Sequence, residues 1–417
     1  MKIAVWHNLP SGGGKRALYD HVRGLVERGH VVEAWCPDIA DSTYLPLSDM
    51  IVEHRLPFPS VSTRGGPFGR LMEPYSDVVN KLAAMDTHCR ACAQEIEHGG
   101  FDLLFANACQ SFRVTSIARD VSLPKVLYLQ EPYRDLYEAL PVLPWAAMPP
   151  RQVRWGREEF RARVQDAARI QGLRIQVREE RANAAAFDMI LANSLYSRES
   201  ILRAYGLDSK VCYLGVDTDK FRRREVAKAN EVIGIGAFVR EKNIEFVIEA
   251  VGAVPAPRPK LTWIGNVAWP PYLEDLKRFA EGHGVELDAK VRVTDDELLD
   301  ALSRAFAFVY ASRLEPFGLA PLEAGACGLP VIAIAEGGVR ETIVDHVNGL
   351  VVEHDPGAMA AAIEQLRDDP VCARLLGERG ERLVHDRWSL PSAIDRLEAR
   401  LLEVLRRVQD PSLTVRS

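Results

Sequence analysis

Residues 307–328 constrain the fold of this chain more than any other part of its sequence. They open with the short apolar run Ala307–Tyr310, which has the length and character of a buried strand, and continue through residues 312–316, which have the composition of a loop. A helix is predicted to begin near Phe317, because Pro321 then falls in the first turn, where backbone N–H groups have no acceptor within the helix. A strand, a loop and a helix in this order predict the βα unit of a parallel sheet.

Two carboxylates, Glu315 and Glu323, lie eight positions apart across the start of this predicted helix. The N–H groups of Gly318, Leu319 and Ala320 would point out of the helix at its positive end, where an anion such as a phosphate binds favourably. A carboxylate accepts hydrogen bonds from paired hydroxyls, so one glutamate suits a transferred sugar and the other a ribose. The pattern therefore predicts a nucleotide sugar as ligand. The residues predicted to bind this donor are Phe317, Gly318, Leu319 and Glu323.

In the alternative interpretation, Glu315 is an exposed loop residue and Glu323 a solvated helix residue. A pair of glutamates at this spacing would favour that alternative if nothing else in the sequence were informative. The wider sequence favours the functional interpretation. The string S-x-x-E-P-F-G-L-x-x-L-E-A-x-A-C-G-L-P-V-I-A begins at Ser312 and is followed by Gly337, Gly338, Glu341 and the run N-G-L-V at residues 348–351. This pattern resembles the signature of family 4 of the retaining GT-B glycosyltransferases, the glycosyl transferases group 1.

The resemblance implies an α/β fold with two Rossmann-like, doubly wound domains that face each other across a cleft. It also implies metal-independent transfer of a sugar from a UDP or GDP sugar to an acceptor nucleophile. Retention would follow from front-face attack, in which a donor phosphate oxygen takes the proton of the acceptor.

The length of 417 residues suits two domains of about 200 residues each. Residues 215–221 resemble the linker between the domains of this family. We therefore predict residues 1–210 as an acceptor-binding Rossmann-like domain and residues 211–390 as a Rossmann-like domain that binds the nucleotide sugar. Residues 391–417 are predicted to form a C-terminal helix that crosses back to the first domain.

A glycine loop, SGGGK at residues 11–15, follows a predicted buried strand at residues 2–6 and opens a helix that is predicted to run to about Arg28. A helix N-terminus behind such a loop is compatible with phosphate, and the resemblance implies that the loop approaches both the donor phosphate and the acceptor. The predicted donor-binding residues here are Gly12, Gly13 and Gly14, and the predicted acceptor-side residues are Lys15, Gln130 and Glu131. Related sequences commonly carry His where Gln130 stands. Because Gln does not titrate near pH 7, no proton-transfer role is carried over to it.

A basic segment follows the first predicted strand of the second domain, residues 232–236. Lys242 matches the family lysine that neutralises the donor diphosphate as charge grows on the leaving group. The family usually has Arg at the place of Ala237, so Arg240, three positions later, either reaches the same phosphate or is an exposed loop charge. The predicted catalytic residues are Glu315, Lys242 and Arg240.

Further strands are predicted at residues 31–35, 103–105, 126–129 and 189–191, separated by helical segments. The segments at residues 72–96 and 157–187 are predicted to be helical, and the second is longer than a simple Rossmann repeat requires. From Arg151 to Phe187 there are nine arginines against five acids, after an apolar run that contains Trp145 and Met148. This segment either meets anionic lipid or an extended acceptor, or it is a solvated, salt-bridged helix. The charge excess is modest, so peripheral membrane contact is the less favoured interpretation.

Charge and cysteine usage exclude several other classes of protein. The net charge of −6 provides no basic field for a nucleic acid. No apolar stretch approaches the roughly 20 residues that span a bilayer, and the first ten residues lack a signal-peptide pattern. Seven cysteines, an odd number in a long chain, favour reduced thiols and a cytoplasmic location.

Cys89 and Cys92 form a C-x-x-C inside a predicted helix, where a structural role is favoured over a redox role.

The triplet Asp217, Thr218 and Asp219 matches a metal-binding D-x-D pattern of a different glycosyltransferase fold. It falls in a connector without a further ligand cluster, so we predict no metal site and no bound cofactor.

The identity of the acceptor stays open among a small molecule, a glycan and a lipid-linked molecule. Two alternatives to the transferase also stay open: a nucleotide-sugar epimerase of the same fold, and a non-catalytic donor-binding subunit, which the departures at Ala237 and Gln130 motivate.

Overall fold

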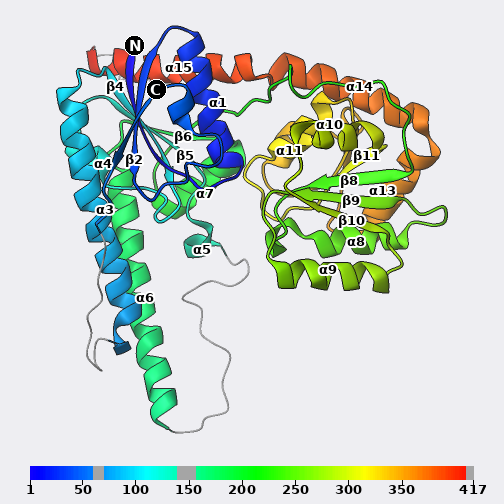
Figure 1. Cartoon of the computed structure of the whole chain (residues 1–417), viewed down its shortest axis with the longest axis horizontal. Helices are drawn as coiled ribbons and strands as arrows, with labels where there is room; N and C mark the ends of the chain where they lie inside the picture. The colour runs from blue at the N-terminus through cyan, green and yellow to red at the C-terminus, as the bar shows by residue number, and fades with distance from the viewer. Residues whose placement is uncertain (60–69, 139–155, 410–417) are drawn as a thin grey trace. The chain divides into compact units, whose positions relative to one another are not determined.

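The computed structural model describes residues 1–59, 70–138 and 156–409 (Figure 1). The chain divides into two compact units. Unit 1 contains residues 1–192, 198–212 and 396–417, and unit 2 contains residues 193–197 and 213–395. Each unit is built around its own parallel sheet.

Unit 1 has a seven-stranded sheet in which all neighbouring strands are parallel, in the order β3-β2-β1-β4-β5-β6-β7. The strands are β1 (Lys2–Asn8), β2 (Val31–Pro37), β3 (Val52–Leu56), β4 (Leu103–Cys109), β5 (Lys125–Gln130), β6 (Met189–Ala192) and β7 (Lys210–Val211). The order reverses between β1 and β4, which is the doubly wound arrangement. Every residue of β4 and β6 is buried, as expected for central strands with both faces covered.

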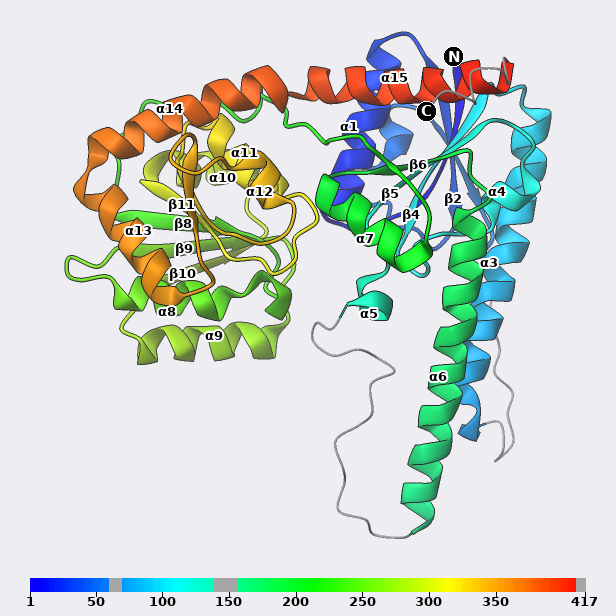
Figure 2. The ribbon, with the colours of Figure 1, turned by 180° about the vertical axis from the view of Figure 1, so that it is seen from behind.

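The helices of unit 1 include one long neighbouring pair, α3 and α6, which run side by side (Figures 1 and 2). The bounds are α1 (Gly13–Glu27), α3 (Glu73–His98), α4 (Ile117–Asp120), α5 (Arg134–Tyr137), α6 (Arg157–Ala184), α7 (Leu195–Tyr205) and α15 (Leu390–Gln409). From residue 396 onward α15 belongs to unit 1, where Glu398 accepts hydrogen bonds from Arg28 at 2.6 Å and from His30 at 2.8 Å. These contacts hold α15 on unit 1.

Unit 2 has a six-stranded parallel sheet in the order β10-β9-β8-β11-β12-β13, so its strand order reverses between β8 and β11. The strands are β8 (Glu231–Ile235), β9 (Lys260–Gly265), β10 (Leu287–Val291), β11 (Ala307–Tyr310), β12 (Val331–Ile334) and β13 (Gly349–Val352). The helices are η2 (Arg240–Lys242), α8 (Ile244–Ala253), α9 (Pro270–Gly282), α10 (Asp295–Arg304), α11 (Leu319–Ala326), α12 (Val339–Thr342), α13 (Pro356–Asp368) and α14 (Pro370–Arg387).

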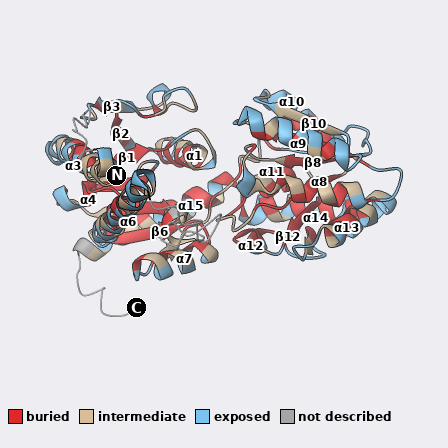
Figure 3. Cartoon of the chain, turned by 90° about the horizontal axis from the view of Figure 1, so that it is seen from below, coloured by how far each residue is buried: buried red, intermediate tan, exposed pale blue. Residues whose placement is uncertain are grey.

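The core of unit 2 joins the sheet to the helices beside it. Val247 of α8, Trp263 of β9 and Ile363 of α13 belong to one cluster of buried apolar side chains. Figure 3 shows the strands mostly in red, the colour of buried residues, whereas the outer faces of the helices are exposed. This amphipathic pattern is the one that a layered α/β unit requires.

The predicted fold class, two Rossmann-like doubly wound α/β domains, is confirmed by the two parallel sheets and their strand orders. The shared cleft and the division of roles between the domains stay predictions. The helix predicted near Phe317 begins at Leu319, so that boundary was wrong by two residues. The reason is Gly318, whose φ of 88° lies outside the helical region and makes it the N-cap.

The arginine-rich helix α6 is bound by ion pairs to neighbouring acids, as the salt-bridged interpretation predicts. Arg163 pairs with Glu159 at 3.2 Å, and Arg169 pairs with Asp166 at 3.0 Å. The predicted apolar run with Trp145 and Met148 lies outside the described residues. None of the helices in the described parts of the chain is both long and apolar enough to cross a membrane.

Candidate active site

In unit 2, the loops after two neighbouring strands, together with the helix that follows one of them, contain the site residues predicted for this unit. β8 leads into the loop with η2, and β11 leads into the loop that precedes α11. β8 and β11 are paired at the point where the strand order reverses. In open α/β sheets, ligands bind outside the carboxyl ends of the strands at such a point. These two loops are therefore the candidate active site of unit 2.

Lys242, Ser312 and Glu315 form a hydrogen-bonded group across the two loops. Lys242 Nζ lies 2.6 Å from Glu315 Oε2 and donates to Ser312 Oγ at 3.3 Å. Ser312 Oγ donates to Glu315 Oε2 at 2.8 Å. Lys242 and Glu315 were predicted from the sequence as site residues, but their mutual contact was not. No role was predicted for Ser312, although the S-x-x-E spacing to Glu315 is a signal that could identify it.

The ion pair with Lys242 fixes the protonation state of Glu315. Burial raises the pKa of the Glu315 carboxyl, but the Lys242 charge and hydrogen bonds from Lys242, Ser312 and Tyr310 outweigh this effect and lower the pKa from 4.5 to about 2. Glu315 is therefore a carboxylate at neutral pH. It can hold a cation or accept hydrogen bonds from hydroxyls, but it cannot act as a general acid.

Gly337 and Gly338 support the Glu315 loop from the neighbouring segment. A Cβ on Gly337 would lie 2.3 Å from Glu315 O, and a Cβ on Gly338 would lie 2.1 Å from Pro316 O. Gly338 N donates to Glu315 O at 2.8 Å. The glycine pair is thus required for close packing, because any side chain would push the Glu315 loop away.

Helix α11 begins directly after this loop, with Gly318 as its N-cap. The N–H groups of Leu319 and Ala320 lie in the first turn, where the helix itself offers no acceptor and its dipole is positive. Glu323 lies one turn further and is 4% exposed, which contradicts the alternative of a solvated helix residue. The binding of a phosphate here and of a ribose by Glu323 stay predictions.

Phe317 belongs to the core rather than to an open ligand surface. Its side chain is buried, and its ring centroid lies 6.1 Å from that of Tyr213 and 5.7 Å from that of Trp388. A donor contact at Phe317 would therefore involve its backbone. This aromatic cluster instead anchors the loop from inside unit 2.

Arg240 is not brought to the Lys242–Glu315 pair. Its side chain is 75% exposed, lies 3.8 Å from Glu245 Oε1 and places its guanidinium 5.4 Å from the centroid of the Tyr272 ring. These contacts direct it toward α8 and α9. Its predicted role at the donor phosphate stays a prediction that would require a change of side-chain rotamer.

In unit 1, the glycine loop and Gln130 lie against each other. Gly12 precedes the first turn of α1, which begins at Gly13. A Cβ on Gly14 would lie 3.4 Å from both Gln130 Nε2 and Gln130 Oε1, so the Gln130 amide packs on this turn. Within the described part of the chain, the buried Gln130 Nε2 has no hydrogen-bond partner. The structure therefore brings together one predicted donor-side residue and one predicted acceptor-side residue.

Lys15 and Glu131, the other predicted acceptor-side residues, are bound within the protein. Lys15 is 1% exposed, its Nζ donates to Asp41 O at 3.5 Å, and burial lowers the pKa of its amine. Glu131 lies 3.2 Å from Arg113 and 3.8 Å from Arg134. Direct contact of either residue with an acceptor stays a prediction.

One group in the described residues has the composition of a metal site. The possible ligand atoms of His7, Cys36 and Glu53, on neighbouring strands, lie within 4.8 Å of one another. Burial raises the pKa of the Cys36 thiol to about 12, which disfavours the thiolate that binds metals. Glu53 already lies 3.0 Å from His7 Nε2 and 3.7 Å from Arg55, with Lys15 as a second nearby cation. This chemistry favours an internal charge network over a bound cation.

The D-x-D and C-x-x-C motifs have local structural roles. Asp217 Oδ1 accepts hydrogen bonds from the backbone N–H groups of Asp219 and Lys220, both at 3.1 Å. Cys89 and Cys92 are buried on α3, and burial raises the pKa of both thiols, that of Cys89 to about 12. The burial of both thiols agrees with the structural role predicted for the C-x-x-C.

The sequence of unit 2 is similar to a known family. Residues 216–383 match the model of the glycosyl transferases group 1. D-inositol 3-phosphate glycosyltransferase 1 of Catenulispora acidiphila is 31% identical over 251 residues, which cover 54% of this chain and 59% of that protein. The GDP-mannose-dependent alpha-(1-6)-phosphatidylinositol monomannoside mannosyltransferase of Mycolicibacterium smegmatis is 32% identical over 224 residues, covering 48% and 58%. The chain thus spans less than two thirds of the length of these relatives.

Solved structures share the fold over nearly the whole chain. The Anabaena protein HepE in complex with UDP and glucose has a TM-score of 0.68 and 16% sequence identity, covering 97% of this chain and 100% of that chain. Sucrose-phosphate synthase from Thermosynechococcus elongatus has a TM-score of 0.70 and 17% identity, with the same coverage. At these identities the similarity is one of fold.

Proposed function

This chain belongs, through residues 216–383, to the glycosyl transferases group 1 family and has the GT-B fold, and on that basis we propose that it is a retaining, metal-independent glycosyltransferase. It moves a sugar from a UDP or GDP sugar to an acceptor nucleophile. The observation that carries the proposal is the Lys242–Ser312–Glu315 group, which lies beside the N-terminus of α11 where the strand order reverses.

In this proposal, the donor diphosphate binds between Lys242 and the first turn of α11. The ammonium group has three N–H donors, and among the described residues Glu315 and Ser312 take two of them, so one remains for a phosphate oxygen. The N–H groups of Leu319 and Ala320 supply further donors with a favourable dipole. Lys242 thereby neutralises the charge that grows on the leaving nucleoside diphosphate. Arg240 is proposed as a second phosphate ligand after rotation away from its present contacts.

Glu315 and Glu323 are proposed to hold the two sugars of the donor. Glu315, ionised because of its pKa of about 2, accepts hydrogen bonds from hydroxyls of the transferred sugar. Glu323, eight positions later, accepts hydrogen bonds from the ribose. With a pKa of about 2, the Glu315 carboxylate is too weak a base to take the proton of a hydroxyl group. The proton of the acceptor is therefore assigned to an oxygen of the donor phosphate during front-face attack.

The acceptor is proposed to approach the glycine loop of unit 1 near Gly14 and Gln130, which can orient it by hydrogen bonds without titrating. The two curated relatives are named for an inositol phosphate and a phosphatidylinositol mannoside. For this chain we propose a hydroxyl-bearing small molecule, glycan or lipid-linked molecule. We place the reaction in the cytoplasm, in keeping with seven cysteines that are all free thiols.

The test is incubation of the purified chain with a panel of UDP and GDP sugars, followed by NMR of the products. The proposal expects slow hydrolysis of one nucleotide sugar, and retained anomeric configuration once an acceptor is added. Conversion of the donor sugar into its epimer would instead establish the epimerase. Tight donor binding without any turnover over a broad acceptor panel would establish the non-catalytic subunit.

A further inference from the structure

An ion pair beside the candidate active site has no role in the proposed function. Arg313 Nε donates to Glu336 Oε2 at 2.7 Å. Arg313 lies in the loop after β11 and Glu336 in the loop after β12, and these parallel strands are neighbours in the sheet of unit 2. Both loops therefore lie at the edge of the sheet that carries the candidate active site, and the ion pair joins them.

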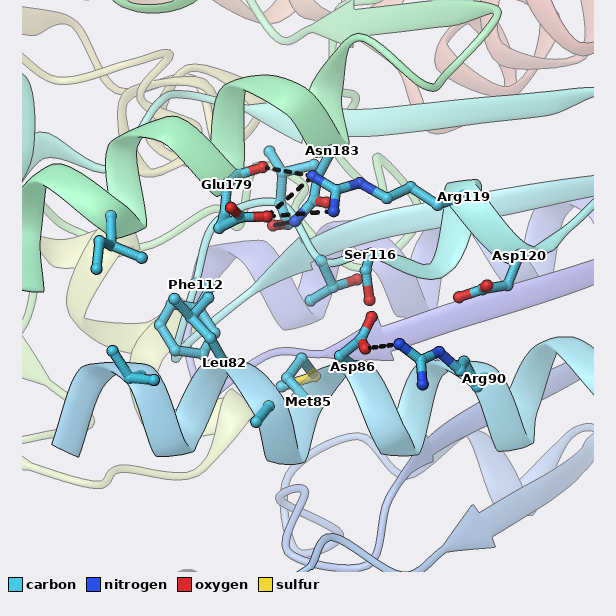
Figure 4. Close-up of a pocket in the computed structure, with 15 residues that line it drawn as sticks. Leu82, Met85, Asp86, Arg90, Phe112, Ser116, Arg119, Asp120, Glu179 and Asn183 are labelled. Atoms are coloured by element: carbon cyan, nitrogen blue, oxygen red, sulfur yellow. Dashed lines mark hydrogen bonds and ion pairs between the residues drawn. The ribbon is translucent and has the colours of Figure 1, made fainter. Parts of the chain in front are cut away.

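This ion pair differs from those that join helices. In Figure 4, for example, Arg119 of α4 lies 3.1 Å from Glu179 of α6. The backbones of these helices are already fixed by their own hydrogen bonds, so a partly exposed ion pair between them contributes little to their positions. The two segments that Arg313 and Glu336 join form neither helix nor strand. Their ion pair can therefore decide the conformation of a loop.

Leu314, the residue between Arg313 and Glu315, has an unusual backbone conformation. Its φ is 47°, which lies in the left-handed region. A residue with a side chain adopts this region at a cost that corresponds to a preference of roughly tenfold for the ordinary conformations. Such a conformation persists only where surrounding contacts hold it, and it is concentrated at functional sites. The contacts around Leu314 must therefore offset this cost.

Glu336 supplies one of these contacts. The Oε2 atom that accepts a hydrogen bond from Arg313 also accepts a long one, of 3.4 Å, from the backbone N–H of Leu314. On the other side of the loop, the backbone N–H of Arg313 donates to Glu241 O at 3.1 Å. The side chains of Arg313 and Glu336 are 35% and 21% exposed, so water screens their attraction only in part. Glu336 thus holds the two residues that precede Glu315.

The conformation of Leu314 decides where the Glu315 side chain lies. Glu315 Oε2 lies 2.6 Å from Lys242 Nζ, and Glu315 O accepts a hydrogen bond from Gly338 N at 2.8 Å. A change of φ at Leu314 to the ordinary negative values would rotate the chain that follows by roughly 100° about the N–Cα bond. Such a rotation would separate Glu315 from both partners.

We propose that Glu336 is a positioning residue of the candidate active site. By binding Arg313 and the N–H of Leu314, it holds Leu314 in the left-handed conformation that directs the Glu315 carboxylate toward Lys242. The position of Glu315 relative to Lys242 is a property of the free protein. The consequence for catalysis rests on the proposed function, because it requires that Glu315 binds the transferred sugar.

The first test measures the protonation of Glu315 in the full chain without nucleotide sugar. Carboxyl ¹³C NMR from pH 6 down to about pH 3 follows the glutamates, and the signal of Glu315 is the one that Glu315→Gln removes. With a pKa of about 2, Glu315 of the wild type should not titrate in this range. In Glu336→Ala we expect a midpoint above pH 3, because the carboxylate has lost the nearby charge of Lys242.

Glu353→Ala is the matched control, since it removes an exposed glutamate that directly follows β13. Its Glu315 signal should behave as in the wild type. Near-UV circular dichroism shows whether each variant is folded at each pH. A Glu315 signal that does not titrate in folded Glu336→Ala would overturn the proposal.

The second test changes the backbone preference at Leu314 and leaves Glu336 in place, so it decides the proposal even if Glu336→Ala unfolds in acid. Asn adopts the left-handed region more readily than most residues with a side chain, whereas β-branched Val is strongly disfavoured there. We expect Glu315 to stay ionised to about pH 3 in Leu314→Asn and to titrate in Leu314→Val. Adding Leu314→Asn to Glu336→Ala should restore the ionised state. The same behaviour of Glu315 in the Asn and Val variants would overturn the proposal.

The third test measures the consequence for the proposed function. We expect kcat for sugar transfer to fall at least about tenfold in Glu336→Ala, because a misplaced Glu315 no longer orients the sugar. The Kd for the donor nucleotide, measured by calorimetry, should stay within about threefold, since the proposed diphosphate ligands are unchanged. An unchanged kcat in this variant would refute the catalytic consequence. A wild type without transfer activity would refute the proposed function, and the NMR comparisons would then decide the role of Glu336 by themselves.

Discussion

Replacement of Lys242 by methionine tests the ion pair at the centre of the candidate site. The change keeps the length of the side chain but leaves the Glu315 carboxylate without its cation, 2.6 Å from the former ammonium position. The side chains of Lys242 and Glu315 are 24% and 17% exposed, so water screens the loss only in part. We therefore expect Lys242→Met to lower the stability of unit 2 at neutral pH.

The magnitude follows from the pKa of Glu315. A pKa lowered from 4.5 to about 2 corresponds to about 3 kcal/mol in favour of the ionised form, at about 1.4 kcal/mol for each tenfold change in an equilibrium constant. Removal of one partner from a buried pair costs about 3–5 kcal/mol in other proteins, which agrees with this figure. We expect a loss of about 3 kcal/mol at pH 7.

The pH dependence of this loss has a definite sign. Because the folded-state pKa of Glu315 is lowered, its contribution to stability is fully present above pH 4.5 and disappears as the pH falls from 4.5 toward 2. The difference in stability between the wild type and Lys242→Met should therefore shrink across this window. A difference that stays constant down to pH 2.5 would contradict the pKa of about 2.

The assay is a double-mutant cycle of Lys242→Met, Glu315→Gln and the combined variant in urea unfolding. We expect a coupling energy of about 2–3 kcal/mol at pH 7, because each single change leaves a buried group unpaired and the double change removes both. A coupling energy below about 0.5 kcal/mol would show that the pair is no stronger than an ordinary surface salt bridge. In that case the pKa argument for Glu315 would be refuted.

Three further predictions concern the site. Glu323→Gln should raise the Kd for the donor nucleotide, measured by calorimetry, by about tenfold through loss of the ribose contact, whereas Glu315→Gln should mainly lower kcat, measured from initial rates. Equal Kd values for the two variants would show that the roles are wrong. EDTA should leave the transfer rate unchanged, and a full loss of activity restored by magnesium or manganese would reopen the metal interpretation of Asp217. Gly337→Ala should destabilise unit 2 by about 2 kcal/mol or more, since a Cβ would lie 2.3 Å from Glu315 O at a φ of 63°. Gly282→Ala, where no atom lies within 4 Å of the added Cβ, is the control, and equal melting temperatures for the two variants would contradict the packing role.

Features that are local in sequence could be predicted well. The apolar runs became β1, β2, β4 and β11 because a parallel strand buried on both faces must be continuously apolar. The helix behind the glycine loop was predicted to run to about Arg28 and ends at Glu27. By contrast, β3 was not identified, because its sequence VEHRL is largely polar. It pairs with β2 in the sheet, and its Glu53 lies 3.0 Å from His7 Nε2 of β1.

Contacts between distant segments could not be predicted, because they depend on strand order. Lys242 meets Glu315 only because β8 and β11 are neighbours, and no periodicity in the sequence encodes that pairing. Gly337 likewise acts on Glu315 through close packing of two loops that are separated along the chain. The burial of Lys15 was missed for the same reason, since the groups around its amine come from other elements.

A crystal structure of the chain with the nucleoside diphosphate of the sugar that the donor panel selects would test the proposed donor site directly. We expect the diphosphate within hydrogen-bond distance of Lys242 Nζ and of the N–H groups of Leu319 and Ala320, with the ribose hydroxyls at Glu323. A nucleotide bound elsewhere, or an empty α11 N-terminus at millimolar nucleotide, would contradict the assignment of this site as the donor site.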